Sequence, residues 1–170
     1  RGGTVDKGTA GTDTFSDFYE TIKASSLNND WIDALTGGGL NSSLQADLQN
    51  NSLTINGLQG TQNISLNVHN FENIDGSNNA DQLKGDQRNN IIQGNGGDDL
   101  FLASSGNDTY SFGLGNDTID YSSLGQAIRL VRGGTVDKGT AGTDTFSDFY
   151  ETIKASSLNN DWIDALTGGG

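Results

Sequence analysis

The chain has 170 residues and a formal net charge of −13 at pH 7, a charge that disfavours nucleic acid and anionic membranes as partners and favours divalent cations. Hydrophobic residues make up 32% of it and aromatic residues 8%, while 25 residues are glycines with no side chain to bury, so its core must be thin. The sequence has no cysteine and no long apolar run, which excludes disulfides, thiolate metal sites and a membrane-spanning segment.

The two ends of the chain carry the same sequence. Residues 1–39 recur without a difference as residues 132–170, an offset of 132 − 1 = 131 positions. Either the parent protein is a tandem array of near-identical units, or one end was duplicated by engineering. We favour the array, in which neighbouring copies of the same repeat are the partners. The predicted division is 1–39 as a partial copy, 40–73, 74–121, and 122–170 as the start of the next unit.

The segment 40–73 has the pattern of strands and turns. Apolar residues alternate at Leu53 and Ile55 and again from Ile64 to Val68, which predicts two strands. Leu44 and Leu48 stand at helical spacing, so a short helix is the alternative there.

Between residues 74 and 121 a large apolar residue recurs every nine positions, and an Asp or Asn lies two positions before each one from the second onward. One buried side chain and, usually, one carboxylate per nine residues predict a solenoid whose turns bind metal. The apolar column is Ile74, Leu83, Ile92, Phe101, Tyr110 and Ile119, and the polar column is Asp81, Asn90, Asp99, Asp108 and Asp117.

Each part of the nine-residue period has a separate physical role. Glycine in the first half permits a tight turn with positive φ and inward carbonyl groups. The Asp supplies the hard anionic oxygen that Ca²⁺ prefers. The apolar residue is the centre of a short strand. Acids that recur at a fixed phase in turns indicate more than solubility.

The residues in these turns resemble the RTX family, whose hemolysin-type calcium-binding nonapeptide reads Gly-Gly-x-Gly-x-Asp-x-apolar-x. The lines are GSNNADQLK from 76, GDQRNNIIQ from 85, GNGGDDLFL from 94, ASSGNDTYS from 103 and FGLGNDTID from 112, with an isolated GTAGTDTFS at 8 and 139. The resemblance implies an all-β fold, a parallel β-roll or β-solenoid with calcium-binding turns, flanked by wider irregular solenoid coils. It implies Ca²⁺ as the cofactor.

In the family, successive turns alternate between two edges of the roll, and each ion lies between turns on one edge. Carried over to this chain, turns 76–81, 94–99 and 112–117 share one edge, and turns 85–90 and 103–108 share the other. The site between turns 94–99 and 112–117 is expected to be the best one. The implied metal-binding residues are Asp81, Gly94, Gly97, Asp99, Gly106, Asp108, Gly113, Gly115 and Asp117.

Some turns depart from the family pattern. Arg88 stands where a glycine is expected and Asn90 where the Asp is expected, and turn 76–81 keeps only its first glycine and Asp81. Calcium is therefore expected mainly between residues 94 and 117, where the pattern is kept. Turn 103–108 lacks two glycines but keeps Gly106 and Asp108, so it is an intermediate case.

The leading functional interpretation is a calcium-dependent structural repeat module of a large secreted or cell-surface bacterial protein, such as an adhesin or filament stalk, exported by type I secretion. The alternatives are a module that binds a cell-surface glycan, for which Trp31 and Trp162 are the candidate residues, and an accessory folding segment of a secreted RTX enzyme. His69 has no catalytic companion at a suitable spacing, so the chain is not expected to be an enzyme. Residues 1–39 are expected to be the less well capped end of the chain, or to borrow the surface of a neighbouring molecule.

Overall fold

The all-β prediction is confirmed. The structure is a computed structural model that describes residues 4–6, 12–14, 21–23, 29–33, 42–58, 62–131, 133–147 and 152–164. Within these ranges the regular structure is β-strand, apart from one 3₁₀ turn, η2 (Gly139–Ala141). None of these residues forms a helix that is long and apolar enough to span a membrane.

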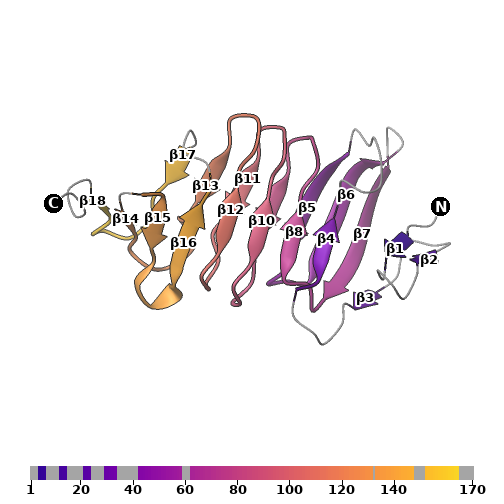
Figure 1. The fold of residues 1–170 in the computed structure, drawn as a ribbon, viewed down its shortest axis with the longest axis horizontal. Coiled ribbons are helices and arrows are strands. Elements are labelled where there is room, and N and C mark those ends of the chain that lie inside the picture. Colours follow the sequence, from indigo (N-terminus) through magenta and orange to yellow (C-terminus); the bar gives the residue numbers. More distant parts are fainter. Residues whose placement is uncertain are drawn as a thin grey trace.

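Most of the strands lie in two eight-stranded sheets that extend along the long axis of the molecule (Figure 1). In spatial order the first sheet contains β17 (Thr152–Lys154), β13 (Thr118–Asp120), β11 (Leu100–Leu102), β9 (Gln82–Lys84), β5 (Ser43–Asp47), β6 (Ser52–Leu58), β7 (Gln62–His69) and β3 (Thr21–Lys23). The second contains β18 (Trp162–Asp164), β14 (Arg129–Val131), β15 (Thr135–Asp137), β16 (Thr143–Phe146), β12 (Thr109–Ser111), β10 (Ile91–Gln93), β8 (Asn73–Asp75) and β4 (Trp31–Asp33). A separate antiparallel hairpin joins β1 (Thr4–Asp6) to β2 (Thr12–Thr14).

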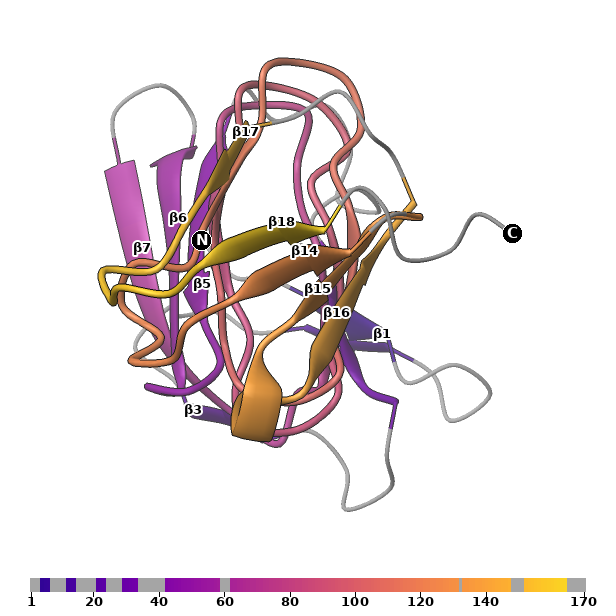
Figure 2. The same ribbon diagram turned by 90° about the vertical axis from the view of Figure 1, so that its left-hand side faces the viewer.

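In the middle of the chain, successive strands from β8 to β13 belong alternately to the two sheets. Each pairs in parallel with the strand 18 residues away, so that Ile74 lies beside Ile92 and Phe101 beside Ile119. Seen along the long axis, these coils lie one behind another (Figure 2). The nine-residue period therefore places one three-residue strand in each sheet, and two periods complete one coil.

Two columns of side chains fill the space between the sheets. The predicted apolar column, from Ile74 to Ile119, is fully buried. A second buried column begins with glycine at Gly76, Gly85 and Gly94 and continues with larger residues, which the sequence analysis did not recognise as core: Ala103, Phe112 and Tyr121. As a result the core becomes aromatic towards the C-terminal turns, where the rings of Phe101 and Phe112 meet edge to face with centroids 5.1 Å apart.

The segments on either side of the nonapeptide run differ from the wider coils that were expected. Strands β5, β6 and β7 form an antiparallel meander, and so do β14, β15 and β16. Local turn chemistry explains the first reversal, since Asp47 Oδ1 accepts the Asn50 N–H at 2.9 Å and Asn51 has a φ of 55°. The alternative of a helix at Leu44 is wrong, because Leu44 lies inside β5 with its side chain buried.

The two identical copies have different neighbours. Strand β3 pairs with β7 and β4 with β8, whereas their second copies, β17 and β18, pair with β13 and β14. Most of residues 1–39 lies outside the described residues. Burial can be compared at residues 29–32 and their copies 160–163, and where the copies differ the expected order is reversed. Trp31 is better covered than Trp162, and Ile32 is 7% exposed whereas Ile163 is 80% exposed.

Close stacking of the turns predicts that one glycine matters far more than another with the same backbone conformation. A Cβ at Gly106, where φ is +108°, would lie 2.0 Å from the carbonyl oxygen of Arg88. At Gly133, with φ +105°, no described residue beyond the chain neighbours has an atom within 4 Å of the corresponding position. Both alanine variants bear the backbone strain, about 1–2 kcal/mol. Gly106→Ala should lose about 1–3 kcal/mol more by overpacking, as measured by urea unfolding in saturating calcium. Equal losses in the two variants would contradict this packing.

Candidate metal site

Three aspartates lie in line at one edge of the coils, in the turns that were expected to share that edge. Oδ1 of Asp99 accepts the N–H of Asp81 at 2.8 Å, and Oδ1 of Asp117 accepts the N–H of Asp99 at 2.7 Å. All three residues are buried. This edge therefore concentrates three carboxyl groups in the protein interior, where each needs a donor or a cation.

Asp81, the first of the three, has its donors within the protein. Its Oδ1 accepts the N–H of Leu44 at 2.7 Å and the hydroxyl of Ser77 at 2.9 Å. Its Oδ2 accepts the N–H of Ser77 at 2.6 Å. These donors satisfy both carboxylate oxygens of Asp81 within the protein, which agrees with the departure of turn 76–81 from the calcium pattern.

Asp99 differs from Asp81 in having an unsatisfied oxygen. Its Oδ2 is buried and has no hydrogen-bond partner within the described parts of the chain. A Cβ added at Gly94 would lie 2.2 Å from this oxygen and 2.6 Å from the carbonyl oxygen of Phe112. A carboxylate and a carbonyl from two adjacent turns thus gather around a space that only glycine leaves open. Hard oxygen donors of these two kinds are what Ca²⁺ prefers, so the residues present fit a calcium ion.

The raised pKa of Asp99 also supports a cation at this position. Burial, together with the nearby charges of Asp81, Asp117 and Asp98, raises the pKa of the Asp99 carboxyl group to about 7, against the hydrogen bond from the Asp81 N–H. A carboxylate in this position lacks a positive charge. A bound divalent cation would supply that charge and hold the group ionised.

Backbone oxygens would have to complete the coordination of any metal at this edge. Across the described ranges, no cluster of three or more acidic, histidine or cysteine side chains is placed to hold a metal ion. The site between turns 94–99 and 112–117 would therefore use Asp99 and Asp117 together with carbonyl groups such as that of Phe112.

The predicted glycine ligands in these turns have a visible structural role. Gly97, Gly113 and Gly115 all have positive φ. A Cβ at Gly115 would lie 1.9 Å from the carbonyl oxygen of Gly97, and one at Gly113 would lie 2.2 Å from that of Asn95. These glycines let each turn stack on the turn 18 residues earlier. Their part in binding calcium stays a prediction.

At the second edge, turn 85–90 is occupied by a guanidinium group and an amide. The Arg88 side chain pairs with Glu72 and donates from Nε to Oδ2 of Asp86 at 2.8 Å. Oδ1 of Asn90 accepts the Asp86 N–H at 2.9 Å, and its Nδ2 donates to the Glu72 carbonyl at 2.7 Å. The side chains at both departures therefore have partners within the protein, and the turn lacks the carboxylate that the calcium pattern requires.

Turn 103–108 also differs from the calcium pattern. Oδ1 of Asp108 accepts the N–H of Asn90 at 3.0 Å, and its Oδ2 accepts the hydroxyl of Ser104 at 3.1 Å. The same Oδ2 lies 3.3 Å from Nζ of Lys138, which also contacts Asp144. The residues here do not fit a metal ion, so the structure does not support Gly106 and Asp108 as calcium-binding residues.

The nine-residue pattern from 74 to 121 did not identify Lys138 or Asp144 as site residues. Asp144 lies in the isolated line GTAGTDTFS, and its Oδ1 accepts the N–H of Asp108 at 3.3 Å, so this turn extends the second edge. Lys138 immediately precedes that line. A lysine next to a nonapeptide that keeps its Asp is the signal that could have indicated the pair.

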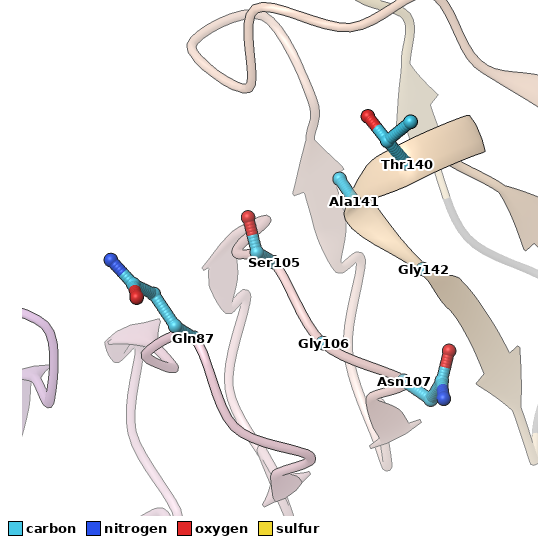
Figure 3. Close-up of a pocket in the computed structure, with 7 residues that line it drawn as sticks. All are labelled: Gln87, Ser105, Gly106, Asn107, Thr140, Ala141 and Gly142. Carbon is cyan, nitrogen blue, oxygen red and sulfur yellow. The ribbon is translucent and has the colours of Figure 1, made fainter.

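A surface depression of about 390 Å³ lies over the second edge and is shown in Figure 3. None of the residues that line it is charged or aromatic, and neither Trp31 nor Trp162 is among them. It therefore lacks the aromatic platform that the glycan alternative requires. Its lining is Gln87, Ser105, Gly106, Asn107, Thr140, Ala141 and Gly142.

The raised pKa of Asp99 predicts opposite effects of pH with and without calcium. The folded-state pKa of about 7 exceeds the ordinary value of 3.8, so in calcium-free solution the contribution of Asp99 to stability is present below pH 3.8 and is lost as the pH rises through 7. Calcium must displace this proton, so the apparent affinity should fall up to about tenfold per pH unit below pH 7. Calorimetric titrations from pH 5 to 8 measure the affinity, and a pH-independent affinity would contradict the assignment.

Comparison with known families agrees with this geometry. Residues 75–110 and 84–119 match the family model of the RTX calcium-binding nonapeptide repeat (4 copies). The match covers both turns of the candidate calcium site and ends before Lys138 and Asp144. A search of curated proteins found no significant match.

Proposed function

Because residues 75–119 are RTX calcium-binding nonapeptide repeats, we propose that the chain is a calcium-dependent structural module in the repetitive stalk of a large secreted or cell-surface bacterial protein. The observation that supports this most strongly is that both sheets begin and end on copies of the same two strands. At one end of the molecule the outermost strands are β3 and β4, and at the other they are β17 and β18. Residues 21–23 and 31–33 are identical to 152–154 and 162–164.

A single copy between two units can continue both sheets. Strand β17 pairs in parallel with β13 on one side, and β3 pairs in parallel with β7 on the other. The antiparallel meander reverses direction twice, so β3 and β17 have the same direction. The second sheet has the same property, with β18 pairing to β14 and β4 pairing to β8. In an array, one strand with this sequence would have a partner at each edge.

Both sheets also contain the same number of inter-strand steps per unit. Each contains seven inter-strand steps from one copy of the terminal strand to the next. Sheets of equal length can continue side by side without breaking. The exposed Ile163 would then become covered, as Ile32 is covered in this chain. In this proposal the parallel middle of each unit is a β-roll, and the antiparallel meanders connect successive rolls.

Calcium fits such a stalk as its rigidifying ligand. Extracellular calcium modules typically have dissociation constants of about 10⁻⁴ to 10⁻³ M, so the module would stay unfolded in a low-calcium cytosol and fold after type I secretion. Asp99 provides the buried carboxylate that such a switch requires. An adhesin or surface filament is the kind of protein that uses many identical rigid units.

Small-angle scattering on chains of one to four consecutive 131-residue units tests this proposal. Seven steps of about 4.8 Å predict that each added unit lengthens the rod by about 34 Å in calcium. A maximum dimension that grows more slowly than the number of units would show hinged modules and contradict the continuous sheets.

The alternative functions have less support. Trp162 is 68% exposed, but it lies on a terminal strand that the next unit would cover. We propose no enzymatic activity. The glycan alternative can be tested on the same multi-unit chains with a glycan array in the presence and absence of calcium.

A further inference from the structure

The second edge contains a buried ammonium group between two aspartates. Lys138 is fully buried, and its Nζ donates to the carbonyl oxygen of Ser104 at 2.7 Å. It pairs with Oδ2 of Asp108 at 3.3 Å and also with Oδ1 of Asp144. The three partners are two carboxylates and one backbone carbonyl, from the two turns 103–108 and 139–144.

This set of oxygens is of the kind that surrounds calcium in a nonapeptide pair. At the first edge, the corresponding oxygens come from Asp99 and the carbonyl of Phe112, and Oδ2 of Asp99 has no protein donor in the described residues. At the second edge, an ammonium group with three N–H donors has three acceptors, so every donor is used. A metal ion at the same point would have to displace the lysine.

The remaining oxygens of the two aspartates are also satisfied. Oδ2 of Asp144 accepts the hydroxyl of Tyr121 at 2.8 Å, and Oδ1 of Asp108 accepts the N–H of Asn90 at 3.0 Å. At the other end of the same edge, the guanidinium group of Arg88 pairs with Glu72. Organic cations therefore lie at both ends of the second edge.

We propose that Lys138 is a built-in cation that replaces calcium between turns 103–108 and 139–144 and attaches the following unit to the preceding roll without a metal ion. Lys138 and Asp144 belong to the duplicated segment, whereas Ser104 and Asp108 belong to the roll before it. The contact therefore joins the end of one unit to the start of the next. Lys7 and Asp13 have the same spacing in the first copy but lie outside the described side chains.

The number of calcium ions bound per chain tests this assignment, measured by equilibrium dialysis and atomic absorption at pH 7.5. Asp108→Asn should leave the number unchanged, because its carboxylate pairs with lysine. Lys138→Ala should bind one calcium ion more than the unaltered chain, because it frees two carboxylates and a carbonyl and leaves space. Lys154→Ala is the matched control, since Lys154 is a 58% exposed lysine of the same copy that pairs with Asp120.

Three outcomes would overturn the proposal. Loss of one calcium ion in Asp108→Asn would show that calcium uses this turn. An unchanged number in Lys138→Ala, or failure of that variant to fold in saturating calcium, would show that calcium cannot take the place of the ammonium group. If the proposed calcium-dependent function were itself wrong, the unaltered chain would bind no calcium. That result differs from each of these three outcomes.

Discussion

Replacing Asp99 with asparagine is expected to weaken calcium binding by about a hundredfold or more and, above pH 7, to make the calcium-free chain more stable. The first effect arises because the amide lacks the anionic oxygen that faces the Phe112 carbonyl across the space at Gly94. The second arises because the neutral side chain avoids the cost of burying a carboxylate whose pKa burial raises to about 7. Calorimetry measures the affinity, and the far-ultraviolet circular dichroism signal that each chain keeps in EDTA at pH 8 measures the calcium-free stability.

Asp98→Asn is the matched control for Asp99→Asn. Asp98 is the adjacent residue in the same turn, and it is exposed. Its Oδ1 accepts the N–H of Asn116 at 2.9 Å, so its replacement removes the same formal charge without changing the buried carboxylate. The Asp98 variant should keep calcium affinity within a few-fold. Equal losses in the two variants would mean that net charge, and not a site at Asp99, determines calcium binding.

Phe101→Ala is expected to cost about 3–5 kcal/mol of folding free energy even in saturating calcium. Phe101 is fully buried between the sheets, and its ring meets those of Tyr110 and Phe112 edge to face, with centroids 5.7 and 5.1 Å away. Because the core is thin, few other contacts can compensate for the cavity. Urea unfolding followed by circular dichroism measures the loss.

Leu114→Ala provides the comparison for Phe101→Ala. Leu114 is 80% exposed, so its truncation should change the stability by less than about 0.5 kcal/mol. A loss in Phe101→Ala as small as that in Leu114→Ala would mean that the apolar column does not hold the two sheets together.

The nine-residue period alone predicted the repetitive part of the fold. It identified the apolar column, from Ile74 to Ile119, and the strands that contain it, because a fixed period places each apolar residue of the column in the same environment. The resemblance to RTX repeats added the division of turns between two edges. The period did not predict the antiparallel meanders, because their reversals depend on local turns such as the one at Asn51.

The nine-residue period did not predict contacts between side chains that are far apart in the sequence and outside the repeat. Lys138 meets Asp108 across 30 residues, and this contact requires the chain to return through two antiparallel strands. Phe112 stands at a position where the family pattern has glycine, so the pattern does not identify it as part of the core. Both findings lie where the repeat ends, and there a period no longer determines which residues meet.

Calcium titration of the unaltered chain, followed by far-ultraviolet circular dichroism at pH 8, tests the central claim most directly. The chain should lose most of its strand signal in excess EDTA and regain it cooperatively as calcium rises through about 10⁻⁴ to 10⁻³ M, because Asp99 then gains the cation that its buried carboxylate lacks. A spectrum that is the same in EDTA and in calcium would contradict a calcium-dependent module.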